Sequence, residues 1–122
     1  MDSGSGNEGL RKIMRKYQAA GFALIILSSM SVFAGKPEFE LTIRQHLFEP
    51  SIIVIPANTK IKLWVSNEDA SPEEFESYEL NREKVILGGQ RSLIFIGPLP
   101  PGEYPFFGEF NPKSAQGKII VE

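Results

Sequence analysis

Hydrophobic and polar residues alternate with a period of two along much of the chain after residue 37. Phe39, Leu41 and Ile43 are separated by charged or polar residues, which is the pattern of a strand with one buried face. The same alternation recurs at 61–65. These segments predict half-buried β-strands, and in the first of them the odd-numbered side chains are expected to point inward.

Other short segments rich in β-branched or aromatic residues follow, and Pro or Gly residues separate most of them. We expect strands at 38–44, 51–55, 60–66, 74–79, 83–87, 92–96, 104–110 and 118–121. Seven or eight short strands, with no helix long enough for a βαβ unit, predict an all-β sandwich. Pro105 has no backbone N–H, so this position is expected to face an edge or a bulge.

Residues 1–34 have a different character from the rest of the chain. Basic residues at 11–16 precede an apolar run at 19–31, and Val32-Phe33-Ala34 follows. This order is typical of a secretory signal peptide, here cleaved after about Ala34. The run is shorter than the roughly 20 residues of a membrane span, and an uncleaved anchor is the alternative. We therefore predict a leader and signal peptide at 1–34, one domain at 35–122, and a periplasmic location.

The composition of residues 35–122 narrows the possible functions. This part has nine basic and thirteen acidic side chains, a net charge of −4. An acidic surface argues against nucleic-acid binding and suits a cation or a basic partner. The whole chain has no cysteine, which excludes disulfides, thiolate catalysis and iron–sulfur clusters. Residues 35–122 also contain no methionine and a single histidine, His46.

No catalytic motif stands out in the sequence. The chain has neither a nucleophile motif of the G-x-S-x-G kind nor a phosphate-binding loop. A sandwich of this size is also not expected to have the deep cleft that a glycosidase needs for its substrate. We therefore expect a protein that is not an enzyme.

Four sequence segments carry a resemblance to a known fold. They are FEP at 48–50, WVSN at 64–67, PLPPGEYPFF at 98–107 and GKIIV at 117–121. In this order they resemble the cupredoxins, small blue-copper proteins. The resemblance covers most of 39–121 and implies a cupredoxin-like Greek-key β-sandwich.

A closer resemblance lies in PEEFES at 72–77, LNREKV at 80–85 and GEF at 108–110. These segments resemble periplasmic cupredoxin-like proteins that accompany bacterial ferrous-iron permeases. The resemblance implies that the protein binds copper or iron. It also implies that the protein passes metal or electrons to an inner-membrane iron permease, and that it is at most an accessory to iron oxidation.

The resemblance also locates the copper ligands of a type 1 centre, which needs a cysteine, two histidines and usually a methionine. It places Gly108 at the cysteine, Asn111 near the second histidine and Ala115 close to the methionine. The first histidine falls at Glu73 or Glu74. All four ligands are replaced, so we expect no type 1 blue copper. Because an amide is a weaker ligand than imidazole, Asn111 limits metal binding at this end.

A carboxylate site is the remaining possibility for a metal. Glu74 and Glu76 are two residues apart, so they project to the same side of an extended strand, whereas Glu73 faces the other way. With His46 and Glu109 they form a plausible set of one imidazole and three carboxylates for copper or iron, if the sandwich brings them together.

The alternative is that the charged run at 73–83 is a solvated strand face, neutralised by Arg82 and Lys84. His46 would then be a turn histidine, because its parity relative to Ile43 places it outward. In that case the domain is a metal-free interaction module. It would dock through its acidic edge or aromatic end to a membrane or periplasmic partner.

Overall fold

The computed structural model describes residues 35–122, so the predictions made for 1–34 lie outside the described residues. Nine strands lie between Glu38 and Val121, and they form one compact unit over Lys36–Glu122. Both sheets and the hydrophobic core lie within this unit. Within the described residues, no helix is long and apolar enough to cross a membrane.

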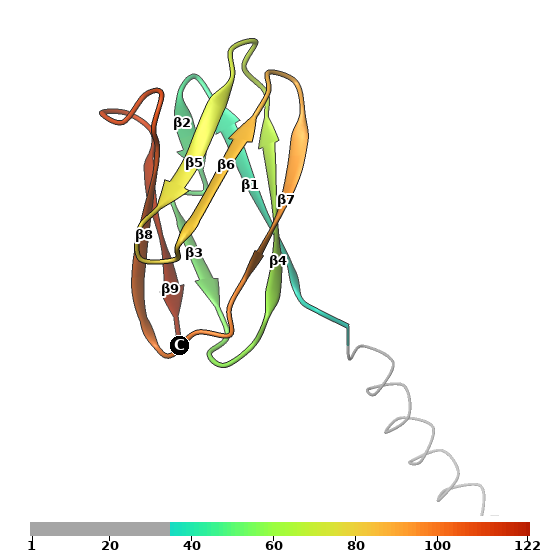
Figure 1. Ribbon diagram of the computed structural model, residues 1–122, viewed down its shortest axis with the longest axis vertical. Coiled ribbons are helices and arrows are strands. Elements are labelled where there is room, and N and C mark those ends of the chain that lie inside the picture. The colour runs from blue at the N-terminus through green and yellow to red at the C-terminus, as the bar shows by residue number, and fades with distance from the viewer. Residues whose placement is uncertain (1–34) are drawn as a thin grey trace, which may run out of the picture. The chain divides into compact units, whose positions relative to one another are not determined.

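The strands form two facing sheets, as Figure 1 shows. The four-stranded sheet has the order β2 (Leu47–Glu49), β1 (Glu38–Arg44), β4 (Ile61–Asn67) and β7 (Arg91–Ile96). The five-stranded sheet has the order β3 (Ile52–Ile55), β9 (Gln116–Val121), β8 (Gly102–Gly108), β5 (Glu73–Ser77) and β6 (Arg82–Ile86). The predicted all-β sandwich is confirmed.

The core lies between the sheets, where the odd-numbered side chains of β1 point as predicted. Leu41 and Ile43 are fully buried. Three aromatic rings link the two sheets, because Phe48 on β2 packs edge-on against Phe106 on β8 at 5.1 Å, and Phe106 stacks on Phe75 at 5.0 Å. Such aromatic pairs each contribute about 0.5–1.5 kcal/mol beyond their buried area.

The structure adds one strand to those predicted, the three-residue β2. It is too short to show alternation in the sequence. Gln45 and His46 join β1 to β2 with φ values of 53° and 57°, as the central residues of a type I′ turn have. Asp69 holds this turn, since its carboxylate accepts the backbone N–H groups of Gln45 at 2.7 Å and His46 at 3.0 Å. These bonds lower the pKa of Asp69, the one from His46 most.

Pro105 lies inside the five-stranded sheet but without a second strand partner. β8 pairs with β5 only at Gly108 and Phe107, so β5 has left β8 before Pro105. The Pro105 carbonyl accepts a hydrogen bond from Ser77 Oγ at 2.7 Å in place of a ladder bond. The missing N–H therefore disrupts no pairing with β5.

Candidate metal centre

The end of the sandwich where β5 begins and β8 ends is built around one buried carboxylate. Glu73 is 1% exposed. Its Oε1 accepts the backbone N–H groups of Glu74 at 3.0 Å and Phe110 at 2.9 Å. Its Oε2 accepts Asn111 Nδ2 at 2.7 Å. Glu73 thus ties β5 to the loop that follows β8.

Gly108 and Ala115 fill the space beside this carboxylate. The Gly108 N–H donates to the Ala115 carbonyl at 2.8 Å. A Cβ atom on Gly108 would lie 2.6 Å from Glu73 Cδ and 2.6 Å from Ala115 Cβ, closer than real Cβ contacts. Only glycine therefore fits at position 108 without a shift of its neighbours.

A second group of carboxylates lies on the outer face of the same sheet. Glu74 and Glu76 alternate with the inward-facing Glu73 and Phe75, as the strand period predicts. Glu76 lies directly opposite Glu83 of β6 in the antiparallel register. One carboxylate oxygen from each of Glu74, Glu76 and Glu83 lies within 4.8 Å of the other two. We call these three residues the carboxylate triad.

Glu76 is the member of the triad least accessible to water. It is 8% exposed, and its Oε2 is buried without a hydrogen-bond partner. Phe107 of β8 is its register partner on the side away from Glu83, and the Phe107 ring contacts Tyr78. Burial, followed by the charges of nearby carboxylates with Glu83 first, raises the pKa of Glu76.

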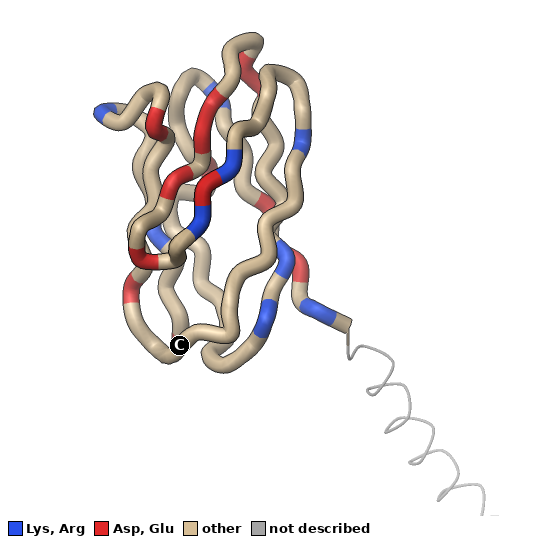
Figure 2. The backbone as a smooth tube through the Cα atoms, viewed as in Figure 1, with Lys and Arg blue, Asp and Glu red and all other residues tan. Residues whose placement is uncertain are grey.

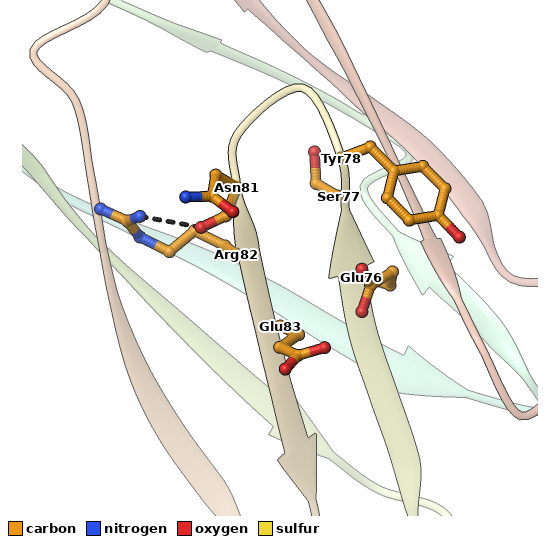
Figure 3. Close-up of a pocket in the computed structure, with 6 residues that line it drawn as sticks. All are labelled: Glu76, Ser77, Tyr78, Asn81, Arg82 and Glu83. Atoms are coloured by element: carbon orange, nitrogen blue, oxygen red, sulfur yellow. Dashed lines mark hydrogen bonds between the residues drawn. The ribbon is translucent and has the colours of Figure 1, made fainter.

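Basic side chains do not neutralise the triad. Figure 2 shows Lys and Arg flanking the acidic position on β6. However, none of the ion pairs within residues 35–122 includes a member of the triad. The Arg82 guanidinium donates to the carbonyls of Phe95 and Asn81, both at 2.9 Å. In Figure 3 it points away from Glu76 and Glu83, whereas the Glu83 side chain extends toward β5.

Two members of the triad, Glu76 and Glu83, line a hollow of about 470 Å³ at the β5–β6 hairpin (Figure 3). Its lining residues are Glu76, Ser77, Tyr78, Asn81, Arg82 and Glu83. Glu83 is exposed and Glu74 is half-buried. A hydrated ion can therefore reach the carboxylates from solvent.

A family model for the cupredoxin-like domain matches residues 18–121. This chain belongs to the cupredoxin-like domain family. A relative of this cupredoxin-like protein, an uncharacterized protein of Rickettsia prowazekii (strain Madrid E), is 45% identical over 84 residues. The match covers 69% of this chain and 67% of that protein.

Solved structures of copper proteins share the fold. Auracyanin A, a blue copper protein of Chloroflexus aurantiacus, superposes with a TM-score of 0.63 at 10% identity, covering 72% of this chain and 100% of the other. Amicyanin of Paracoccus versutus superposes with a TM-score of 0.55 at 19% identity, covering 73% and 83%. At these identities the likeness shows the fold alone.

A type 1 copper centre does not fit this cupredoxin-like domain. The positions that the resemblance assigns to copper ligands do converge, at Glu73, Gly108, Asn111 and Ala115. They offer a carboxylate whose oxygens already accept hydrogen bonds, an amide that donates to it, and no sulfur or imidazole. The absence of cysteine from the whole chain agrees with this.

The structure brings together only part of the predicted metal set. Glu74 and Glu76 belong to the triad. Glu109 lies beside them, since its backbone N–H donates to the Glu74 carbonyl at 2.9 Å, and its charge helps to raise the pKa of Glu76. His46 does not join the group within the described residues, because the β1–β2 turn places its Nδ1 3.6 Å from Asp69.

The third member of the triad is Glu83, which the sequence prediction did not include, and not His46. It was missed because a ligand on the neighbouring strand depends on the register of the hairpin. The only sequence signal is the short turn at 78–81, which sets residue 83 opposite residue 76.

Proposed function

We propose that this cupredoxin-like protein binds a divalent cation, copper or iron, at Glu74, Glu76 and Glu83. In this role it serves as an exported accessory of a ferrous-iron permease. The observation that carries the proposal is the buried Glu76 Oε2, which has no partner and belongs to a carboxylate facing Glu83.

The energetics of the triad favour a bound cation. Like charges directly opposite each other on paired strands are destabilising, and a buried acceptor without a partner also costs free energy. A divalent cation among the three oxygens offsets both costs. Carboxylate oxygens are the ligands that hard cations prefer, which supports an ion such as Fe(II) or Mn(II).

The partner and the location rest on sequence features. The segments at 72–77, 80–85 and 108–110 resemble those of accessory proteins of iron permeases, and 1–34 has the layout of a signal peptide. The proposed partner is therefore an inner-membrane permease, and the proposed location is the periplasm. Fractionation of cells that express the full chain, with N-terminal sequencing of the product, tests export and cleavage after about Ala34.

A calorimetric titration of residues 35–122 tests the binding. We expect one Mn(II) or, without oxygen, one Fe(II) per chain, because the described residues contain one such group. Glu74→Ala/Glu76→Ala should weaken binding about 10-fold or more. Glu79→Ala is the matched control, since Glu79 is an exposed glutamate of the same hairpin outside the triad.

Circular dichroism of each variant must show an intact fold before affinities are compared. Wild-type binding no stronger than that of the double variant overturns the proposed function. That outcome, together with loss of partner binding in the double variant, would instead support the metal-free docking module.

A further inference from the structure

The ligand chemistry of the triad separates a cation-carrying role from an electron-carrying role. We propose that the triad is a cargo site for cations in an oxygen-preferring state, which holds Cu(II) but releases copper on its reduction to Cu(I). The domain would then hand over a cation and would not cycle copper to move electrons. This inference rests on the proposed function, namely that the triad binds a cation.

The triad offers only oxygen ligands. Cu(I) is a soft ion that thiolate or thioether ligands select, whereas carboxylates suit harder cations. The chain has no cysteine, and no methionine lies in residues 35–122. The single imidazole, His46, lies at the β1–β2 turn with Asp69 and not with the triad. Reduction therefore converts a bound copper ion into one that these ligands do not retain.

The other metal position of the fold does not provide a place for Cu(I). Glu73 already accepts three hydrogen bonds there, one of them from Asn111 at 2.7 Å. No side chain beyond hydrogen fits at Gly108. A reduced ion that leaves the triad thus has no sulfur-containing or vacant site to enter within the described domain.

The accessibility of the triad also suits exchange. Structural metal sites are closed by protein ligands, whereas sites that must admit another ligand keep a position open. Here the buried Glu76 supplies a fixed ligand, while Glu74 is half-buried and Glu83 is exposed beside the 470 Å³ hollow. Water, or a carboxylate of a receiving protein, can complete the coordination from the open side.

The test compares retention of copper before and after reduction. Residues 35–122 are loaded with one equivalent of Cu(II) or of Mn(II) and washed by ultrafiltration under argon. Ascorbate then supplies one electron per Cu(II), and acetonitrile keeps the released Cu(I) dissolved. We expect about nine-tenths of the copper in the filtrate after reduction, and no added loss of manganese under the same treatment.

Two variants sharpen the result. Glu79→Ala should behave as wild type, and His46→Ala should retain Cu(II) equally well. Copper that stays on the protein after reduction, or a reversible copper couple in voltammetry, overturns the inference. Loss of Cu(II) binding in His46→Ala overturns it as well, because an imidazole would then hold the ion. If neither ion is retained before reduction, the proposed function itself fails.

Discussion

Asn111 Nδ2 donates a 2.7 Å hydrogen bond to the buried Glu73 Oε2 across 38 residues of sequence. The sequence resemblance assigns one histidine ligand of copper to Glu73 or Glu74 and the other to a position near Asn111. A side-chain hydrogen bond thus joins two elements of the sandwich, β5 and the loop after β8.

Removal of the Glu73 carboxylate should destabilise the domain strongly. Glu73→Ala leaves the N–H groups of Glu74 and Phe110 and the Asn111 amide without their acceptor. We expect a loss of about 3 kcal/mol in the free energy of unfolding, measured by urea denaturation. Glu73→Gln should lose less stability, because Asn111 can rotate its amide so that Oδ1 accepts a hydrogen bond from the new NH₂ group. A loss below about 1 kcal/mol for Glu73→Ala would show that this network contributes little.

Gly108→Ala tests how tightly this end is filled. The new methyl group would lie 2.6 Å from both Glu73 Cδ and Ala115 Cβ, so its neighbours must move. Overpacking of this kind costs about 1–3 kcal/mol, which thermal unfolding can measure. Gly35→Ala is the matched control, since nothing lies within 4 Å of its added Cβ. Wild-type stability in Gly108→Ala would contradict the close packing.

The sandwich could be predicted because its strands follow local rules. The alternation at Phe39, Leu41 and Ile43 is set by neighbours in the sequence, and burial follows it. The opposite orientations of Glu73 and Glu74 followed from the same period. These features need no knowledge of the rest of the chain.

The composition of the site depended on contacts that the sequence does not display. Glu83 joins Glu76 through a register between two strands, and His46 is kept from them by a turn bonded to Asp69, 23 residues away. The hydrogen bonds of Glu73 depend in turn on the conformation of the loop after β8. Each of these contacts joins residues from different strands or loops, so the alternation of hydrophobic and polar residues cannot predict it.

The stability of the metal-free domain should rise as the pH falls below neutrality. Burial and the neighbouring carboxylates raise the pKa of Glu76 in the folded state. The folded state then binds a proton more tightly than the unfolded state between the two pKa values, so protonation stabilises the fold. The contribution of Asp69 to the pH dependence has the opposite sign. Because the pKa of Asp69 is lowered in the folded state, this contribution is confined to more acidic solution.

Glu76→Gln isolates this effect. The variant should have a higher Tm than wild type near neutral pH, and it should lose the rise in Tm that wild type shows as acidification protonates Glu76. Differential scanning fluorimetry with a chelator present measures both. Glu79→Gln is expected to keep the wild-type profile. A lower Tm for Glu76→Gln at neutral pH, with the wild-type pH slope, would be inconsistent with a strained Glu76.

The β1–β2 turn should accept a better turn sequence. Gln45 and His46 have φ values of 53° and 57°, and type I′ turns favour Asn-Gly at these positions. Gln45→Asn/His46→Gly should stabilise the domain by about 1 kcal/mol in urea denaturation. The bonds to Asp69 come from the backbone and remain. Unfolding at lower urea than wild type would contradict the turn assignment.

Under the proposed function, this cupredoxin-like domain binds its metal at the triad and not at the end that Glu73 and Asn111 close. Anomalous difference density from crystals of residues 35–122 grown with Mn(II) locates the bound ion. We expect a peak about 2.0–2.6 Å from oxygens of Glu74, Glu76 and Glu83. A peak at Glu73 and Asn111, or beside His46, with none at the triad, would contradict it.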